Sequence, residues 1–460
     1  MEILIIPNEK ILAIIGEQPV FANKDYRFMK YCLVRDVPEG KLIFNGLTRT
    51  LIILSDEELQ EIGNINKYPF LYKNYFLVPE DYDEMKVVDE VREKFKKPID
   101  DLYLNNPQSF TVLTTTKCNA RCFYCYELHH KNKKHMAKET AIKIADYIQA
   151  YAPSDGRAIN ICFFGGEPLY NQESIDIIVN RLIEYGRPFT TTIVSNGYLF
   201  TTELVNKAKN IWNLVDAQIT IDGTEEIYNK TKNYIYKVGG SPYKKVLNNI
   251  AMLLNRGISV SIRLNIDNYN AEDLKKLVVE LHNRFGNHQG LSIYSWPIFE
   301  DENFSRTPEE HAAVFDRVKE LDDILINHGY NSGLYPKSEI AYCQCMADDG
   351  NSVLIDPEGN MGTCEHFTNS HFFGNINNPA EKNFNELNIW REYNPPLDIC
   401  ADCPIYPSCI RPTHCEEMGK CDIYFKEWRI NRHLNGLLFP YMQTRNNMTQ
   451  LPRRLSENVQ

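Results

Sequence analysis

The cysteines of this chain fall into two groups whose spacing is that of metal ligands. The chain has 460 residues and 13 cysteines, and an intracellular chain of this size seldom keeps so many without metal or redox chemistry. The first group is Cys118, Cys122 and Cys125. The second group is Cys343, Cys345, Cys364, Cys400, Cys403, Cys409, Cys415 and Cys421. Cys32 and Cys162 stand alone and are interpreted as core residues, because an isolated cysteine behaves like a small apolar side chain.

The first group places three thiolates on one tight loop, in a Cys-x3-Cys-x2-Cys run. A cluster of four irons normally takes four thiolates, so three leave one iron free to hold another ligand. Zinc is the alternative, since cysteine pairs of this kind are common in zinc sites. Zinc sites are usually closed by a fourth protein ligand, however, so the spacing favours an iron-sulfur cluster.

The region around residues 110–297 alternates short β-rich runs with longer amphipathic stretches, a pattern typical of βα units and a parallel sheet. Six strands are predicted, over 110–115, 159–164, 191–195, 217–222, 258–266 and 291–296. Apolar residues at helical spacing predict helices between them, for example over 138–151 and 174–185. Six such units indicate an α/β fold built on a partial (β/α)6 TIM barrel.

Polar signatures follow four of these strands. They are the first cysteine group, Gly165-Gly166-Glu167-Pro168, Ser195-Asn196-Gly197 and Asp222-Gly223, in chain order. In barrels of this kind the carboxyl ends of the strands build the active site. We therefore expect the four signatures to meet at one edge of the sheet.

The first cysteine group, with Tyr124 before its last cysteine, resembles the defining motif of the radical S-adenosylmethionine superfamily. The resemblance implies that the open iron binds the amino and carboxylate groups of S-adenosylmethionine. One electron then splits the carbon-sulfur bond and gives a 5'-deoxyadenosyl radical, which abstracts hydrogen from the substrate. The cofactors would carry this chemistry, and the protein would supply orientation.

The glycine motif resembles the second motif of that superfamily. There, Gly165 and Gly166 would let the backbone approach the methionine part, and Glu167, followed by Pro168, would help to bind its amino group. A structural turn is the alternative for such a glycine pair.

Further cofactor contacts follow from the resemblance. Ser195, Asn196 and Thr220 resemble positions near the adenosyl group, although short polar pairs after strands are often only helix caps. The family pattern that begins at Asp222-Gly223 usually ends in Arg, whereas this chain has Lys232, which keeps the charge but loses the planar fork. Arg263 in the fifth strand could substitute for it or be structural.

The second cysteine group resembles the cysteine-rich extension called the SPASM domain, which carries two auxiliary four-iron clusters. The family usually has three residues where this chain has five between Cys409 and Cys415. The resemblance assigns Cys343, Cys345, Cys364 and Cys415 to one cluster, and Cys400, Cys403, Cys409 and Cys421 to the other. Cys343 and Cys345 are separated by one residue only, and binding of both to the same cluster is sterically difficult. One of them could therefore be a free thiolate, which would leave one iron of the cluster open. Structural zinc is again the alternative.

Glu365 directly follows Cys364, where the related anaerobic sulfatase maturases carry an acidic residue proposed to take a substrate proton. It is interpreted as a catalytic general base or as a surface carboxylate.

The domain prediction has five segments. Residues 1–95 are predicted to be a small α+β, winged-helix-like domain, with strands at 31–34 and 41–45 and a helix start at Ser55. The barrel over 105–305, a helical linker over 306–342, a cysteine-rich iron-sulfur domain over 343–435 and a tail over 436–460 follow. The first domain resembles the leader-recognition domain of peptide maturases, which binds a precursor's leader by strand addition. A cap over the barrel is the alternative.

The composition excludes other classes of protein. The formal charge of -11 disfavours a general nucleic-acid binder. Hydrophobic runs are far too short to span a bilayer, and the N-terminus lacks a basic region followed by an apolar core. We therefore expect a cytoplasmic protein with neither a membrane nor a nucleic-acid partner.

These features predict an oxidoreductase with three [4Fe-4S] clusters and S-adenosylmethionine, reduced by an external donor such as flavodoxin or ferredoxin. The preferred hypothesis is a maturase that installs a thioether or carbon-carbon crosslink in a ribosomally made precursor peptide. The alternatives are a sulfatase maturase that converts Cys or Ser to formylglycine, and a non-catalytic iron-sulfur electron carrier or scaffold.

Overall fold

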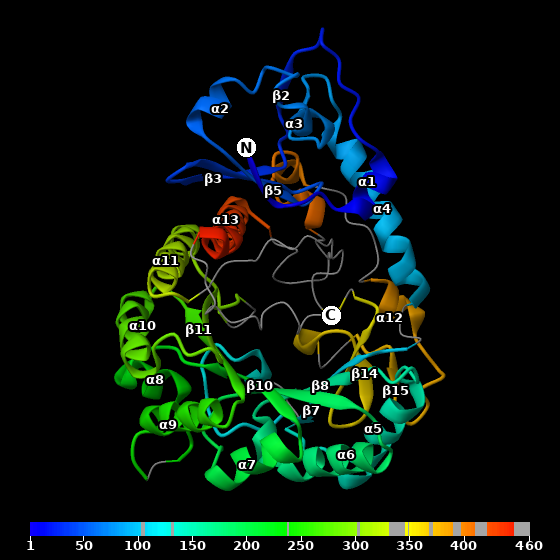
Figure 1. The fold of residues 1–460 in the computed structure, drawn as a ribbon. Helices are drawn as coiled ribbons and strands as arrows, with labels where there is room; N and C mark the ends of the chain where they lie inside the picture. The colour runs from blue at the N-terminus through cyan, green and yellow to red at the C-terminus, as the bar shows by residue number, and fades with distance from the viewer. Residues whose placement is uncertain are drawn as a thin grey trace. The chain divides into compact units, whose positions relative to one another are not determined.

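The six predicted strands form a parallel sheet in a computed structural model of the chain (Figure 1). The structure describes residues 1–102, 106–129, 133–236, 239–300, 304–330, 346–347, 349–367, 371–389, 397–409 and 421–445. The chain divides into two compact units, which we call the barrel unit (residues 102–331 and 345–392) and the terminal unit (residues 1–101, 332–344 and 393–460).

The sheet of the barrel unit runs in the order β12-β11-β10-β9-β8-β7-β13-β14-β15. Its parallel strands are β7 (Ser109–Thr115), β8 (Ile159–Gly165), β9 (Phe189–Ser195), β10 (Leu214–Thr220), β11 (Ser259–Ile266) and β12 (Leu291–Pro297). The edge strands are β13 (Ser352–Ile355), β14 (Asn360–Gly362) and β15 (Gly374–Asn375). β13 joins in parallel beside β7, with Ser352 opposite Ser109, and this pairing was not predicted from the sequence.

Helices cover the outer side of the sheet, as α6, α7 and α9 show in Figure 1. They are α5 (Lys138–Tyr151), α6 (Gln172–Glu184), α7 (Thr202–Asn210), α8 (Glu225–Lys232), α9 (Pro242–Asn255), α10 (Ala271–Phe285) and α11 (Pro308–Asn327). The short helix α12 (Phe384–Asn388) follows β15 in the chain and does not belong to this layer. Three short 3-10 turns, η1 (Tyr126–His129), η2 (Pro168–Asn171) and η3 (Glu365–Phe367), complete the unit.

Alternation along each strand separates the two faces of the sheet. In β10, Ala217 and Ile219 are buried toward the helices, whereas Asp216, Gln218 and Thr220 are half-buried on the other face. Because side chains alternate along a strand, one face builds the core and the opposite face is left polar. α11 packs on β12 and on α10, so it continues the helical layer.

The terminal unit contains an antiparallel sheet in the order β1-β5-β4-β3. Its strands are β1 (Glu2–Ile5), β3 (Cys32–Val37), β4 (Gly40–Asn45) and β5 (Thr50–Leu54), and β2 (Tyr26–Phe28) pairs separately with β6 (Leu77–Pro79). The helices are α1 (Glu9–Ile15), α2 (Asp56–Gln60), α3 (Pro69–Lys73), α4 (Glu84–Leu102) and α13 (Ile423–Arg445), with η4 (Asp398–Cys400) and η5 (Tyr406–Ser408) between the last two.

One hydrophobic core holds the terminal unit together across the sequence. Tyr31 and Leu33 of the sheet and Val88 of α4 are buried with Ile405 of the cysteine-rich segment and Leu437 of α13. The helix start predicted at Ser55 is confirmed, because its side chain caps α2 in a reciprocal capping box with Glu58.

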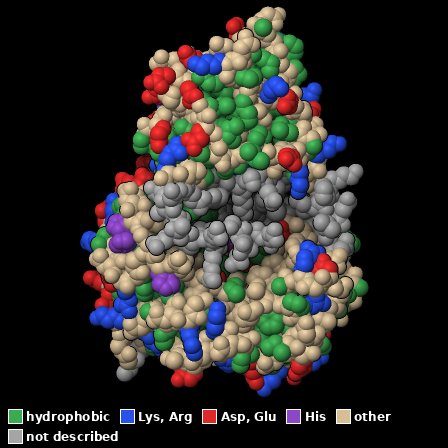
Figure 2. Space-filling model, in the orientation of Figure 1, with side chains coloured by type: hydrophobic (Ala, Val, Ile, Leu, Met, Phe, Trp, Pro, Cys, Tyr) green, Lys and Arg blue, Asp and Glu red, His purple; other side chains and the backbone are tan. Residues whose placement is uncertain are grey.

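On the face shown in Figure 2, acidic and basic side chains are interspersed over the coloured residues. None of the helices in the described ranges combines the length and the apolar character that a bilayer span requires.

Candidate active site at the carboxyl ends of the barrel strands

The three cysteines of the first group lie on the loop between β7 and η1. The sulfur of Cys118 accepts a hydrogen bond from the Ala120 amide at 3.3 Å, and the Cys125 amide donates to the Cys122 carbonyl at 3.2 Å. Burial raises the pKa of Cys118 to about 12, and Glu167 and the other two thiols add to this increase. The loop therefore brings the three thiols close enough to interact electrostatically.

Gly165 and Gly166 let the end of β8 touch the start of the cysteine loop. A Cβ on Gly165 would lie 2.1 Å from the Thr115 carbonyl oxygen, and one on Gly166 would lie 2.6 Å from the Lys117 carbonyl oxygen. The Gly166 and Glu167 amides donate to these same two oxygens at 3.0 Å each. The glycines thus fix the loop directly through the backbone.

Glu167 is fully buried and ties the strand ends to one another. It accepts hydrogen bonds from the Ser195 hydroxyl at 2.9 Å, the Asn196 amide at 2.8 Å and the Leu169 amide at 3.2 Å. Burial raises its pKa from 4.5 to about 7, although these donors act in the opposite direction. Pro168, also buried, begins η2 and accepts a hydrogen bond from Thr114 at 3.0 Å.

Asn196 reaches the cysteine loop from β9. Its side-chain nitrogen donates to the Asn119 side-chain oxygen at 2.7 Å and lies 3.8 Å from the Cys118 sulfur. Its own side-chain oxygen accepts from the Tyr198 amide at 3.0 Å. Ser195 and Asn196 are therefore both present at the site, with Glu167 and Asn119 as partners.

Tyr124, Asp222 and Lys232 form a buried polar cluster beside the loop. The Tyr124 hydroxyl donates to Asp222 at 2.7 Å, and Lys232 forms an ion pair with the same carboxylate oxygen at 2.8 Å. The Lys232 ammonium also donates to Tyr124 at 3.1 Å and to Thr220 at 2.6 Å. Asn265 of β11 donates to the Tyr124 hydroxyl at 3.2 Å.

Arg263 lies on the polar face of β11, in register with Thr220 on one side and Tyr294 on the other. Its Nε donates to the Asn265 side chain at 2.8 Å, and its guanidinium lies over the ring of Trp296 at 5.7 Å. None of the carboxylates in the described ranges forms an ion pair with Arg263. Its terminal nitrogens are thus available for an anionic group.

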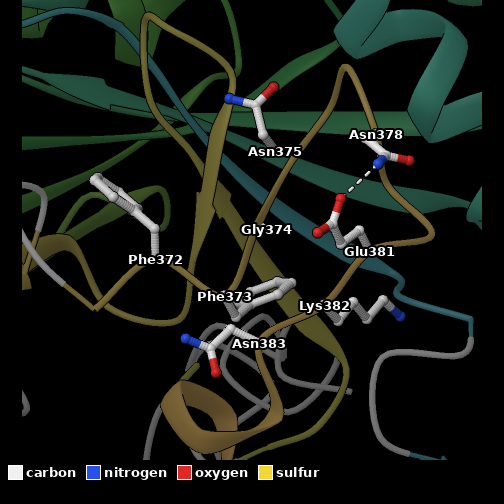
Figure 3. Close-up of a pocket in the computed structure, with 8 residues that line it drawn as sticks. All are labelled: Phe372, Phe373, Gly374, Asn375, Asn378, Glu381, Lys382 and Asn383. Atoms are coloured by element: carbon white, nitrogen blue, oxygen red, sulfur yellow. Dashed lines mark hydrogen bonds between the residues drawn. The ribbon is translucent and has the colours of Figure 1, made fainter.

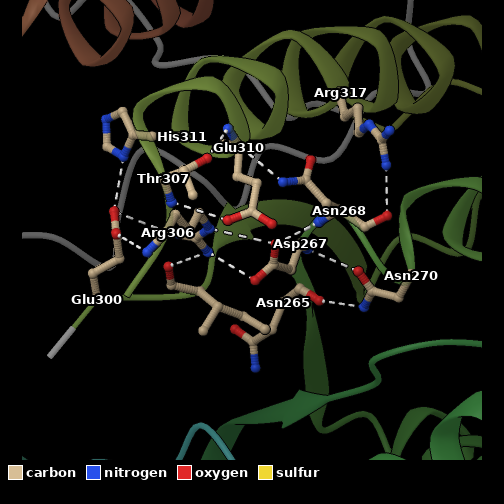
Figure 4. A network of polar contacts seen from close by, with 11 residues as sticks. Asn265, Asp267, Asn268, Asn270, Glu300, Arg306, Thr307, Glu310, His311 and Arg317 are labelled. Carbon is tan, nitrogen blue, oxygen red and sulfur yellow. Dashed lines mark hydrogen bonds and ion pairs between the residues drawn. The ribbon is translucent and has the colours of Figure 1, made fainter. Parts of the chain in front are cut away.

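A second polar network supports the ends of β11 and β12 (Figure 4). Arg306 pairs with Asp267 at 3.0 Å and with Glu300 at 3.3 Å, and His311 lies 2.8 Å from Glu300. Asn270, next in this network, donates to the carbonyls of Asp222 and Asn265 at 2.9 Å each. The network therefore positions Asp222 and Asn265, whose side chains both form a hydrogen bond with the Tyr124 hydroxyl.

Glu365 and Cys364 lie close to the first cysteine group. Tyr126, which directly follows Cys125, stacks on His366 with ring centres 4.4 Å apart. Burial raises the pKa of Tyr126 well above its ordinary value, and Glu127, Glu365, Cys125 and Cys364 all add to the increase. η1 and η3 thus bring the two cysteine-bearing segments of the barrel unit together.

A shallow hollow of about 360 Å³ lies further along the same segment (Figure 3). Its lining includes Phe373, Asn375, Glu381 and Lys382. The side-chain amide of Asn378 donates to Glu381 at its rim, at 2.7 Å. None of the predicted site residues lines this hollow.

Cys400, Cys403, Cys409 and Cys421 belong to the terminal unit. Burial raises the pKa of Cys403 to about 11, with Cys409 and Cys400 adding to it and Lys426 opposing it. Cys343, Cys345 and Cys415 lie outside the described residues. Within the described ranges, no three side chains of His, Cys, Asp or Glu are gathered as ligands of a single metal ion.

The residues around the cysteine loop fit an iron-sulfur cluster with a small polar ligand. The donor set is thiol only, as such clusters require. Three buried polar atoms at this loop have no hydrogen-bond partner among the described residues: the side-chain nitrogen of Asn119, one oxygen of Glu127 and one oxygen of Asp222. A polar ligand seated here would satisfy groups that are otherwise costly to bury.

Sequence reasoning missed three contributors to this site, which are the carboxylate of Asp222, the amide of Asn265 and the carboxyl of Glu127. Asp222 was noted only as part of a loop signature, and Asn265 was hidden inside a predicted strand. Glu127 follows the last cysteine by two positions, which is the signal that could have identified it.

The fold and the site together define an α/β barrel with three cysteines, a glycine motif and buried polar groups at its strand ends. Residues 112–281 match the model of the Radical SAM superfamily. The barrel of this chain therefore belongs to the Radical SAM superfamily, as predicted.

Several curated relatives are similar to this chain. The radical SAM cyclopropyl synthase TigE of Paramaledivibacter caminithermalis is 22% identical over 347 residues, which cover 70% of this chain and 69% of TigE. A GTP 3',8-cyclase of Clostridium perfringens is 26% identical over 295 residues, covering 60% of this chain and 84% of that protein. A serine-type anaerobic sulfatase-maturating enzyme of Bacteroides thetaiotaomicron is 26% identical, covering 56% of this chain and 69% of that enzyme.

Two solved structures share the fold. The structure of anSMEcpe with bound AdoMet has a TM-score of 0.53 at 16% identity and covers 75% of this chain and 97% of that chain. Streptococcus suis SuiB bound to precursor peptide SuiA has a TM-score of 0.52 at 12% identity and covers 86% of this chain and 97% of that chain.

Proposed function

We propose that this chain is a radical S-adenosylmethionine maturase that installs a thioether or carbon-carbon crosslink in a ribosomally made precursor peptide. The observation that carries the proposal is the loop of three thiols held against the glycine motif at the strand ends. Similarity to TigE, and to the fold of SuiB bound to a precursor peptide, supports a substrate of this class.

Cys118, Cys122 and Cys125 would hold the first cluster, and S-adenosylmethionine would complete it. When bound, this pair of cofactors supplies a carbon radical that removes a hydrogen atom from the substrate. The chain's own residues bind and orient them. Glu167 holds the Asn196 amide and the Ser195 hydroxyl in place, and the Asn196 side chain lies beside Cys118 and Asn119, where the adenosyl part would lie. Arg263 presents terminal nitrogens that suit a carboxylate.

The second cysteine group would hold two auxiliary clusters. We assign Cys364 to one of them, with Cys343, Cys345 and Cys415, and the four described cysteines of the terminal unit to the other. Glu365 is suited to receive a proton from a bound substrate, because it lies near Tyr126, the residue that follows Cys125. A reductant such as flavodoxin or ferredoxin would supply electrons, as expected in the cytoplasm.

Residues 1–95 would bind the leader of the precursor. Their sheet ends in β1 and β3, and an extended peptide can add to such an edge through main-chain hydrogen bonds.

A sulfatase maturase that makes formylglycine is the second candidate. It is supported by the similarity to the enzyme of Bacteroides thetaiotaomicron and by the carboxylate of Glu365 next to Cys364. A non-catalytic electron carrier is the third, and it predicts that S-adenosylmethionine stays intact.

The test begins with the full chain, reconstituted with iron and sulfide without oxygen and then reduced. We expect it to convert S-adenosylmethionine to 5'-deoxyadenosine, and Cys122→Ala to lose this activity. Intact S-adenosylmethionine would leave only the electron carrier. Co-expression with short peptides encoded beside the gene then separates the two maturases. Tandem mass spectrometry finds two residues joined in one fragment after a crosslink, whereas formylglycine carries an aldehyde that a hydrazide reagent labels.

A further inference from the structure

Lys232 has no hydrogen-bond donor left for a ligand. An ammonium group carries three N–H donors. In this structure they are directed at Thr220 at 2.6 Å, at Asp222 at 2.8 Å and at Tyr124 at 3.1 Å. The Lys232 side chain is 3% exposed and that of Asp222 is 0% exposed, so the ion pair is closed off from solvent.

The same segment also holds the cysteine loop through its backbone. The Arg121 amide donates to the Lys232 carbonyl at 2.8 Å, and the Ile235 amide donates to the Asn119 carbonyl at 2.9 Å. Asn233 between them adopts a left-handed conformation, with φ of 43°, at the end of α8. Residues 232–235 therefore run alongside the loop that carries Cys118 and Cys122.

Lys232 is electrostatically close to one of these thiols. The Lys232 ammonium lies 3.1 Å from the Tyr124 hydroxyl, which donates to Asp222 at 2.7 Å, and Tyr124 lies on the loop between Cys122 and Cys125. A buried charge acts over several ångströms with little screening, so both members of the pair act on whatever Cys122 binds.

We propose that Tyr124, Asp222 and Lys232 form a buried latch that holds the cysteine loop in place and sets the electric field at the cluster bound there. The three are positioning residues. The family's arginine at the position of Lys232 has been assigned to the cofactor by resemblance, but here Lys232 is committed to the loop. This inference rests on the proposed function, because it requires that Cys118, Cys122 and Cys125 bind an iron-sulfur cluster.

The field predicts shifts of opposite sign from the two charged members. Reduction adds an electron to the cluster, so a nearby positive charge favours the reduced form. Asp222→Asn leaves Lys232 uncompensated and raises the reduction potential. Lys232→Met leaves Asp222 uncompensated and lowers it, whereas Lys232→Arg keeps the charge and changes it little.

The measurement is a redox titration followed by electron paramagnetic resonance on the reconstituted full chain. The relevant cluster is the one whose signal changes when S-adenosylmethionine is added. Tyr124→Phe keeps both charges, so its potential stays close to that of the wild type. Iron release from this cluster to a chelator becomes several-fold faster, because the hydroxyl that joins the loop to the pair is gone.

Opposite shifts together with faster iron release support the latch. If the reduction potential shifts in the same direction in Asp222→Asn and Lys232→Met, or in neither, while the cluster is intact, the latch is refuted. The proposed function would still stand. If Lys232→Met retains no cluster, Asp222→Asn and Lys232→Arg decide: a positive shift in the first alone supports the latch, and no shift in the first refutes it. If the wild-type chain binds no such cluster, the proposed function is refuted instead.

Discussion

Gly165 lies where the end of β8 meets the start of the cysteine loop, with φ of +119°. An L side chain rarely adopts this conformation, and the nearest atom to a Cβ would be the Thr115 carbonyl oxygen. The glycine pair was expected to make room for a cofactor, and the structure adds a contact within the chain itself. Two separate costs, backbone strain and overpacking, therefore follow from a substitution here.

We predict that Gly165→Ala lowers the free energy of unfolding by about 3 kcal/mol, as the sum of these two costs. Gly186→Ala is the matched control, because Gly186 also has a positive φ, of +65°, but has open space around its Cα. The control is expected to lose only about 1 kcal/mol. Denaturant titration of both variants measures the difference, and equal losses would contradict the crowding argument.

Glu167 predicts a pH dependence of stability. Its pKa is raised from 4.5 to about 7 in the folded chain, mainly by burial, so the folded state prefers the protonated form. Its contribution is fully present below pH 4.5 and is lost as the pH rises through about 7. We expect Glu167→Gln to remove up to about 3 kcal/mol of this dependence. Unfolding curves between pH 5 and pH 8 measure it, and parallel pH profiles for the two proteins would refute it.

Residue types and spacing predicted the cysteines, the glycine motif and the polar residues after β9, because each is a local signature at a strand end. They could not predict the partners of Lys232. Tyr124 precedes Lys232 by 108 positions, and only the folded sheet brings the two together. The same holds for Asn265, whose side chain reaches the site only because β11 lies beside β10.

Among the elements, the six barrel strands were predicted to within three residues at each end. The strands could be predicted because β-rich runs and amphipathic stretches alternate regularly along this part of the chain. β13 was missed because it is four residues long and pairs with β7 across more than 200 positions, which local periodicity does not report. Short strands of this kind are specified by their partners.

Helix α4 holds the cysteine-rich segment of the terminal unit. Arg92 donates to the Cys409 carbonyl at 2.9 Å, and its guanidinium lies 4.6 Å from the ring centre of Tyr406. The Tyr406 hydroxyl in turn donates to Asp89, one helical turn away, at 3.0 Å. Helix α4 thus supports the segment that carries Cys409, one of the predicted metal ligands.

We therefore predict that Arg92→Ala weakens metal binding at Cys400, Cys403 and Cys409. After reconstitution, chelator treatment should remove up to about four more iron atoms per chain than from the wild type, which is the content of one cluster. Lys86→Ala on the same helix is the control, because Lys86 is exposed. Iron analysis and visible absorption measure the loss, and identical retention in both variants would show that the helix gives no such support.

At the scale of the whole molecule, the first hundred residues and the last segment of the chain belong to one unit and share a hydrophobic core. The cysteine-rich segment and the domain proposed to bind a leader are therefore one folded body. Their stability should be linked, because buried residues of each complete the core of the other.

A chain that lacks residues 1–101 should keep the cysteine loop of the barrel but lose at least about four iron atoms per chain. Addition of residues 1–101 as a separate polypeptide during reconstitution should restore them in part. Iron content and gel filtration of the two preparations measure this. A truncated chain that retains its full iron content would show that the two segments are independent.

The division of the chain also orders events during its synthesis. The N-terminal sheet leaves the ribosome long before Ile405 and Leu437, which belong to the core that joins this sheet to the cysteine-rich segment and to α13. At roughly 5–20 residues per second, the ribosome needs tens of seconds to reach Leu437 after it has made the N-terminal sheet, and the barrel emerges in between. During this interval, the apolar residues of the sheet that later pack against Ile405 and Leu437 are exposed to chaperones and proteases.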